Sequence, residues 1–188
     1  GYTVGILARL LTNANLASDH ATDDIAALGG ALHNFMETAR ARGDALVPAI
    51  KGETPVIYAS DRYRTVARIW KIKINENAKT PAFWNVFPEL NHNEMIGWTI
   101  PHGPFHLIVL RDERDHPRVL KRFDVTLDLL RERGMSVSMV PIEGISVTEK
   151  LFTTLLVGDW LSYGLALTLG MDPSPVLLVE DLKKRLKK

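Results

Sequence analysis

The sequence predicts an α/β protein, a three-layer α/β/α sandwich around a mainly parallel sheet. Three short apolar segments, each followed by a longer segment with helical periodicity, lead to this class. Strands that alternate with helices of this length are joined by right-handed crossovers, which cover both faces of a parallel sheet. The 188 residues, 46% of them hydrophobic, suffice for one well-cored domain. No repeat or linker-like composition marks a second one, so we expect residues 1–188 to form a single domain.

The chain begins with helical patterns. Residues 1–50 are expected to form two helices, the second from about Thr22 to Arg42, where apolar residues recur at spacings of three and four. The Gly-Glu-Thr-Pro segment at 52–55 breaks this pattern. The short apolar run Val56–Ala59 then has the composition of a buried parallel strand.

A helix, a loop and a second strand are expected next. Tyr63 to about Ala78 carries one apolar stripe at helical spacing, and Pro81 follows its end. Residues 83–104 mix polar and aromatic side chains without a clear period, which favours a loop. His106–Arg111 is predicted as the second strand because its apolar run is continuous.

The last part of the chain repeats this alternation. Arg118–Arg133 is predicted as a helix closed by Gly134, and Met135–Val140 as the third strand. A long apolar helix is expected over Val147–Leu169, and a final helix over Pro175–Lys188. The long helix contains Asp159, whose charge would be costly at a bilayer centre, so we expect it in the protein core.

Charge and cysteine content exclude several classes of function. Twenty-three Lys and Arg against 22 Asp and Glu give a net charge of +1, which offers no basic surface for nucleic acid. We therefore expect neither a nucleic-acid nor a membrane partner. The absence of cysteine removes disulfides, thiolate catalysis and cysteine-based metal centres, and it fits a reducing, cytoplasmic location.

Ligands of open α/β sheets bind at the carboxyl ends of the strands, here after Tyr58, Arg111 and Val140. No GxGxxG, P-loop, GxSxG or HExxH motif occurs, so nucleotide-dependent and zinc-protease chemistry lack support. His102 and His106 have a spacing that could suit a metal on a helix, but Gly and Pro intervene. We predict neither a metal nor a cofactor.

Residues 70–98 carry the densest set of reactive side chains. Five asparagines, three glutamates, a histidine and three lysines lie between large aromatic residues. Amides can bind sugar hydroxyls, aromatic rings can cover a sugar face, and a carboxylate with an imidazole can move protons. The segment therefore favours a sugar site, although a solvated loop with scattered aromatic anchors has the same composition.

Three motifs within this chain resemble a known family. Asn-Glu-Asn-Ala-Lys at 75–79, Pro-Glu-Leu-Asn-His-Asn-Glu at 88–94 and Asp-Pro-Ser-Pro-Val at 172–176 are similar to the C-terminal half of the bifunctional phosphoglucose/phosphomannose isomerases. The resemblance implies a flavodoxin-like sugar isomerase (SIS) domain. Members of this family carry two such domains, and the Ser/Thr loop that cradles the phosphate lies in the N-terminal one.

The resemblance also implies roles for three residues. Glu76 matches the carboxylate base for the C2 proton, and His92 matches the ring-opening histidine, which in the family reaches the neighbouring subunit's site. Lys183, or Lys184 beside it, matches a lysine that assists at the ring oxygen. Without the family, an exposed helix-end glutamate, a structural histidine and a solvated basic helix end would be the ordinary interpretations.

Substrate contacts are predicted nearby. Asn75 and Asn91 flank the two main candidates, and Ser174 could present a hydroxyl to the C1–C2 region, although a serine between two prolines is equally typical of a turn. Glu89 and Glu94 are interpreted as structural residues that pair with nearby donors.

The resulting hypothesis is aldose–ketose isomerisation of glucose 6-phosphate or mannose 6-phosphate to fructose 6-phosphate through a cis-enediol. The implied partners are the phosphosugar, a second copy of the chain that exchanges His92, and an N-terminal SIS domain in cis or in trans. A non-catalytic SIS module, used for sugar-phosphate binding or for oligomerisation, is the alternative.

Overall fold

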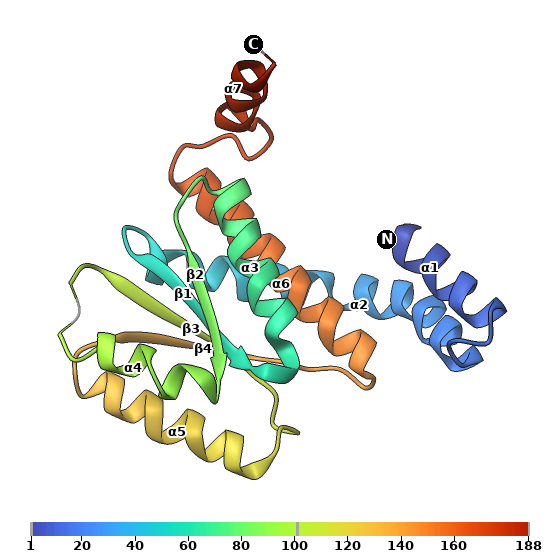
Figure 1. Ribbon diagram of the computed structural model, residues 1–188, viewed down its shortest axis with the longest axis horizontal. Coiled ribbons are helices and arrows are strands. Elements are labelled where there is room, and N and C mark those ends of the chain that lie inside the picture. Colours follow the sequence, from blue (N-terminus) through green and yellow to red (C-terminus); the bar gives the residue numbers. More distant parts are fainter. Residues whose placement is uncertain (1, 101, 188) are drawn as a thin grey trace.

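Four parallel strands form the central sheet in a computed structural model that describes residues 2–100 and 102–187 (Figure 1). Gly1, Pro101 and Lys188 lie outside the described residues. The predicted final helix ends at Lys188, so its last residue also lies outside them. The strand order is β2-β1-β3-β4, and each neighbouring pair is parallel. The strands are β1 (Thr54–Ser60), β2 (Phe83–Phe87), β3 (Phe105–Arg111) and β4 (Ser136–Pro141).

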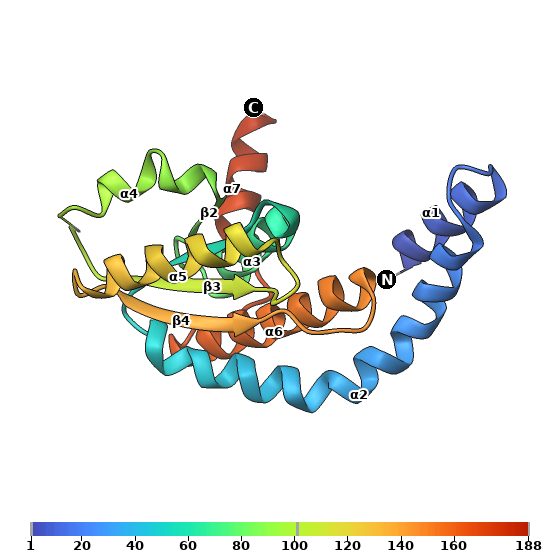
Figure 2. The same cartoon turned by 90° about the horizontal axis from the view of Figure 1, so that it is seen from below.

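Helices cover both faces of this sheet, so the predicted three-layer sandwich is confirmed (Figure 2). Ile57 and Ala59 of β1 face the cluster formed with α2 (Asp19–Ile50), α3 (Arg64–Asn77) and α6 (Val147–Thr168). Val56 and Tyr58, which alternate with them, face α4 (Glu94–Gly97) and α5 (Pro117–Arg131). The short 3₁₀ helices η1 (Asp61–Tyr63) and η2 (Glu89–Asn91) follow β1 and β2.

The strand β2 corrects the prediction of a loop over residues 83–104. It pairs with β1 in the register Val56↔Phe83 to Ser60↔Phe87. As a five-residue edge strand it buries only its last two residues fully, and Phe83 is exposed. The apolar run that marks a buried parallel strand is therefore absent from its sequence.

The helix α2 is longer than predicted, with 32 residues. Its second half continues past Arg42 because Val47 and Ile50 are buried in the core against the sheet. Gly52, with φ of +84°, adopts the left-handed conformation that turns the chain into β1.

The helix α6 lies in the core, as the sequence predicts for its apolar segment. It packs on α2 and α3, and Trp70 of α3 donates its indole N–H to the Thr154 carbonyl oxygen at 3.0 Å. Among the described helices, α6 is the one whose length and composition would also suit a membrane span. Here the packing of α2 and α3 covers a large part of its surface.

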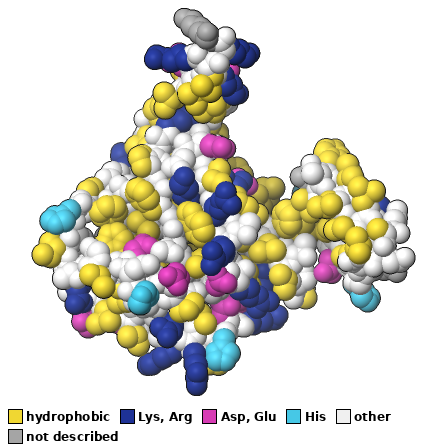
Figure 3. All heavy atoms as spheres, in the orientation of Figure 1, with side chains coloured by type: hydrophobic (Ala, Val, Ile, Leu, Met, Phe, Trp, Pro, Cys, Tyr) yellow, Lys and Arg dark blue, Asp and Glu magenta, His cyan; other side chains and the backbone are white. Residues whose placement is uncertain are grey.

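Two helical arms project from the sandwich. One consists of α1 (Tyr2–Asn13) and the first part of α2, and the other is α7 (Leu177–Leu186) (Figures 1 and 2). Hydrophobic side chains gather on both arms (Figure 3). No residue of α7 is buried among those described, and Leu177 and Leu178 are 76% and 84% exposed. Both arms thus present apolar surface that this chain does not cover.

Candidate functional site

The end of α3 is held rigidly around Glu76. The Asn75 side chain donates from Nδ2 to the Thr80 carbonyl oxygen at 2.7 Å, which closes the turn after the helix. Asn77 donates from Nδ2 to Ser162 Oγ at 2.9 Å and ties α3 to α6. The asparagines on either side of Glu76 therefore fix the backbone from which its side chain emerges.

Lys79 completes this turn. Its φ of +56° places it in the left-handed region at the helix end, a conformation that costs a non-glycine residue about 1–2 kcal/mol. The ammonium group donates to the Glu76 carbonyl oxygen and, at 3.1 Å, to the Pro173 carbonyl oxygen. These bonds join the end of α3 to the chain that follows α6. The sequence interpretation assigned no role to Lys79.

A cavity of about 660 Å³ opens beside this turn. The Glu76 side chain lines it, is exposed, and makes no hydrogen bond or ion pair among the described residues. The expected aromatic walls are absent from the described lining, which is mainly aliphatic. The other lining residues are Asn75, Lys79, Gly170, Met171, Asp172, Pro175, Val176, Leu177, Leu178 and Val179.

The other two candidates from the C-terminal segment, Ser174 and Lys183, do not line the cavity. Ser174 is exposed, and its backbone N–H donates to Asp172 Oδ1 at 2.9 Å, as in the turn the sequence also allowed. Lys183 is exposed on α7 and pairs with Glu180 at 2.9 Å. Both roles stay predictions.

His92 and Asn91 lie beyond the carboxyl end of the edge strand β2, whereas Glu76 lies before its amino end. His92 follows η2, after the carboxyl end of β2, and its imidazole is exposed. Asn91 donates from Nδ2 to Thr126 Oγ1 of α5 at 2.8 Å, so its amide nitrogen is engaged in packing. Its substrate-binding role stays a prediction.

The strand β2 separates the two main candidates. It starts just after the α3 end with Glu76 and runs to the turn with His92 (Figure 1). Five strand residues span roughly 16 Å. Residues 70–98 therefore do not form one loop, and a single chain does not bring Glu76 and His92 around one small sugar.

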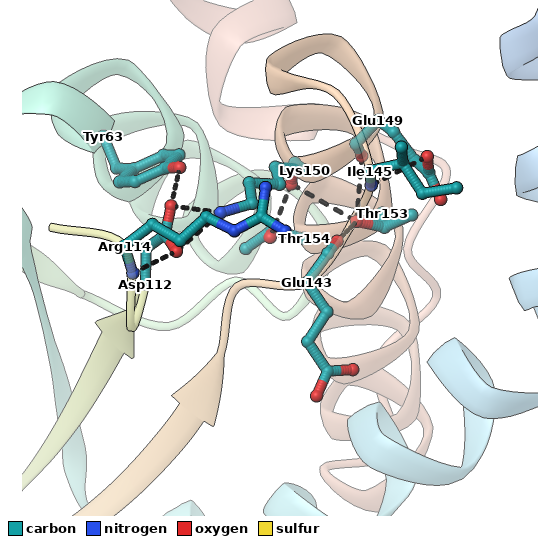
Figure 4. A network of polar contacts seen from close by, with 9 residues as sticks. All are labelled: Tyr63, Asp112, Arg114, Glu143, Ile145, Glu149, Lys150, Thr153 and Thr154. Carbon is teal, nitrogen blue, oxygen red and sulfur yellow. Dashed lines mark hydrogen bonds and ion pairs between the residues drawn. The ribbon is translucent and has the colours of Figure 1, made fainter.

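The carboxyl ends of β1 and β3, where the sequence places ligands of an open sheet, are closed by a polar network (Figure 4). Lys150 of α6 donates to both carboxylate oxygens of Asp112 at 2.6 Å, and Tyr63 donates to the same carboxylate. Asp112 and Lys150 are 1% and 4% exposed. Burial opposes ionisation of Asp112, but the bonds from Lys150 and Tyr63 outweigh it and lower its pKa.

Asp115 lies beside this network, and its pKa is shifted in the opposite direction to that of Asp112. It is buried, and its Oδ2 atom has no hydrogen-bond partner among the described residues. Burial raises the pKa of Asp115, the charge of Asp112 adds to that rise, and the Ser60 hydroxyl opposes it. This cluster was not predicted from the sequence. The one feature of the sequence that could have indicated it is Lys150, a charged residue near the start of the apolar helix α6.

No metal-binding cluster of three or more His, Asp or Glu residues occurs in the part of the chain that the structure describes. His106, 4% exposed, contacts Glu53 through Nδ1 at 3.2 Å and Ser138 through Nε2 at 2.8 Å. This histidine therefore links β3 to the neighbouring strand β4 and to Glu53, which directly precedes β1. The absence of a metal and of a cofactor stays a prediction.

The parallel sheet with helices on both faces and the motif-bearing turns at the two ends of β2 are those of a sugar isomerase (SIS) domain fold. A solved glucose-6-phosphate isomerase like protein from Thermus thermophilus matches with a TM-score of 0.61 and 18% identity, over 76% of this chain and 46% of that one. At this identity the match establishes the fold alone.

Sequence comparison identifies the family. Residues 40–186 match the model of the bacterial phospho-glucose isomerase C-terminal SIS domain, and the chain belongs to this family. The bifunctional phosphoglucose/phosphomannose isomerase of Aquifex aeolicus is 36% identical over 84% of this chain and 50% of its own length. That of Thermoplasma volcanium is 42% identical over 70% of this chain and 42% of its own length. The chain thus spans about half the length of these relatives.

Proposed function

We propose that this chain is the C-terminal SIS domain of an isomerase that interconverts glucose 6-phosphate or mannose 6-phosphate with fructose 6-phosphate. The observation that carries the proposal is Glu76, an unpaired carboxylate at a cavity, held between two asparagines that brace its backbone. The names of the relatives support the same substrate class.

The proposed chemistry is a proton transfer through a cis-enediol. The Glu76 carboxylate takes the C2 proton of the open-chain aldose, and the electron pair of that C–H bond forms the C1–C2 double bond as O1 is protonated. The carboxylic acid then returns its proton to C1 while the O2 proton leaves, so the carbonyl moves to C2. Asn75, which lines the same cavity, is proposed to bind a substrate hydroxyl.

His92 is proposed to open the sugar ring in the active site of a second copy of the chain. Its exposed position at the opposite end of β2 from Glu76 supports this arrangement. An imidazole suits the step because it exchanges protons near neutral pH. Lys183 is proposed to assist at the ring oxygen and Asn91 to contact the sugar.

The phosphate group is proposed to bind to an N-terminal SIS domain, in cis or in trans. This chain offers no Ser/Thr loop of the type that cradles phosphate in the family. Ser174 would then face the C1–C2 region from the turn beside the cavity. We propose a cytoplasmic enzyme, in keeping with a sugar-phosphate substrate.

Proton exchange tests the proposal directly. The chain is incubated with fructose 6-phosphate in D2O, and deuterium entry at C1, and at C2 of the aldose product, is followed by NMR. Exchange that is lost in Glu76→Gln and kept in Glu132→Gln, another exposed glutamate at a helix end, is the expected result. No exchange by the unmodified chain would overturn catalysis by this chain on its own.

The non-catalytic alternative has one observation in its favour, the uncovered apolar surface of α1 and α7. A module used only for sugar-phosphate binding or oligomerisation would bind fructose 6-phosphate or self-associate, but it would not exchange the protons of the sugar with solvent. Binding of fructose 6-phosphate or self-association by the unmodified chain, with no proton exchange in it or in Glu76→Gln, would favour this interpretation.

A further inference from the structure

The turn that carries His92 is anchored on both sides of the histidine. Asn91 precedes it, and Glu94 follows two residues later as the first residue of α4. Both side chains bind other elements of the fold, whereas the His92 imidazole is exposed and makes no hydrogen bond among the described residues. The contacts of Glu94 are the stronger of the two sets.

The Glu94 carboxylate joins α4 to two strands. Its Oε1 accepts a hydrogen bond from the Tyr58 hydroxyl at 2.5 Å, and its Oε2 accepts one from Asn85 Nδ2. Tyr58 and Asn85 are register partners in the parallel pair β1–β2, so they lie side by side on one face of the sheet. One carboxylate therefore uses both of its oxygens to fix the start of α4 on that face.

Tyr58 is built to hold this contact. It is fully buried, and burial, together with the charge of Glu94, raises the pKa of its phenol, so the hydroxyl stays protonated and donates. The same hydroxyl accepts from Trp98 Nε1 at 2.8 Å. Trp98 directly follows α4 and packs edge-to-face on Phe105 of β3. Tyr58 thus ties both ends of α4 to the sheet.

The segment before His92 is held independently. Leu90 is fully buried, and Asn91 donates to Thr126 Oγ1 of α5 at 2.8 Å. The backbone is therefore fixed on each side of His92 while the imidazole remains free to reach outward. Ordinary packing would not require a carboxylate with both oxygens engaged at this turn.

We propose that Glu94 is a positioning residue for His92, fixing through Tyr58 and Asn85 the turn that presents the imidazole to a sugar in another subunit. The inference rests on the proposed function. A displacement of a catalytic group by about 1 Å can cost on the order of 100-fold in rate, so loss of this anchor should slow ring opening.

The first test observes His92 without any reaction. Ring and backbone NMR signals of His92 are compared in the unmodified chain, Glu94→Ala, Glu94→Gln and Glu89→Ala. Glu89 is an exposed carboxylate of η2, on the other side of His92, with no hydrogen bond among the described residues. We expect Glu94→Ala to broaden or shift the His92 signals and to raise backbone mobility there. Glu94→Gln, whose amide oxygen can still accept from Tyr58, should restore part of the order, and Glu89→Ala should change nothing.

The second test is a double-mutant cycle on proton exchange. Glu94→Ala should lower kcat about 10- to 100-fold with little change in KM, and it should have almost no further effect in a His92→Gln background. Equal losses in both backgrounds would overturn the inference. So would unchanged His92 signals in Glu94→Ala. If the unmodified chain exchanges no protons, catalysis by this chain on its own is excluded, and the NMR comparison alone still decides whether Glu94 positions His92.

Discussion

At the residue scale, the buried pair Asp112–Lys150 shows how this chain handles charge inside its core. Two charges taken out of water cost several kcal/mol each, and their attraction compensates only when the geometry satisfies both. Here the ammonium group contacts both carboxylate oxygens, and Tyr63 and a backbone N–H complete the shell. The cost of burying each charge is therefore offset only while the other charge is present.

This balance predicts the effect of breaking the pair. Asp112→Asn leaves the Lys150 charge buried without its carboxylate, so we expect a loss of about 3–5 kcal/mol in the free energy of unfolding. Adding Lys150→Met should recover most of that loss. Urea unfolding measures both, with Asp128→Asn of the exposed Asp128–Arg131 pair as a control that changes stability by about 0.5 kcal/mol or less. A double variant less stable than Asp112→Asn would contradict this account.

The contribution of Asp115 to the free energy of unfolding should depend on pH with the opposite sign to that of Asp112. Its pKa is raised in the folded state, so between the ordinary aspartate value and the raised one the folded protein binds more protons than the unfolded chain. Its contribution to stability therefore falls as the pH rises through that window. For Asp112, whose folded pKa is lowered, stability falls as the pH drops below the ordinary value.

Removing the Asp115 charge should therefore stabilise the protein at neutral pH only. We expect Asp115→Asn to unfold at a higher urea concentration than the unmodified chain near about pH 7 and to lose this advantage near about pH 4. Equal differences at both pH values would show that the effect is steric and not electrostatic.

At the element scale, the strands that could be predicted correctly were those whose continuous apolar sequence indicates that they are buried. The central strands β1 and β3 are continuous apolar runs because helices cover both of their faces, and both were predicted within two residues of their ends. The edge strand β2 shows no such run, since Phe83 is exposed and Asn85 faces Glu94. Missing this strand also hid the distance between Glu76 and His92, because β2 carries the chain along the edge of the sheet from one end to the other between them.

Glycine determines how closely two helices approach. A Cβ atom on Gly43 of α2 would lie 2.6 Å from Trp160 Cβ and 2.7 Å from the Leu161 backbone nitrogen of α6. Neither atom can move without shifting α6. Gly29 and Gly30 of the same helix have nothing within 4 Å of the equivalent position.

This contrast predicts opposite effects of the same substitution. Gly43→Ala should destabilise by about 1–3 kcal/mol through overpacking, whereas Gly29→Ala should stabilise by up to about 1 kcal/mol through helix propensity. Thermal unfolding should show a Tm lowered by several degrees in the first variant and unchanged or raised in the second. A Tm that Gly43→Ala leaves unchanged or raises would mean that helix packing at Gly43 is looser than described.

At the scale of the whole molecule, the two main candidate groups lie at opposite ends of the edge strand β2, and two uncovered apolar arms project from the sandwich. Sequence motifs drew attention to both groups but could not place them, because a motif records neighbours along the chain and not the path of the strand between two motifs. The proposed active site, which takes Glu76 from one copy and His92 from another, would use both groups.

Such an arrangement predicts complementation between two inactive variants. Glu76→Gln and His92→Gln should each exchange the protons of fructose 6-phosphate far more slowly than the unmodified chain. In a mixed dimer, one of the two sites combines the intact Glu76 of one copy with the intact His92 of the other. Random mixing makes half of the dimers mixed, so the mixture should regain about a quarter of the unmodified rate after unfolding and joint refolding. Refolding each variant separately before mixing provides the control. No recovery on joint refolding would mean that both groups serve one chain, and that the roughly 16 Å along β2 is bridged by movement and not by a partner.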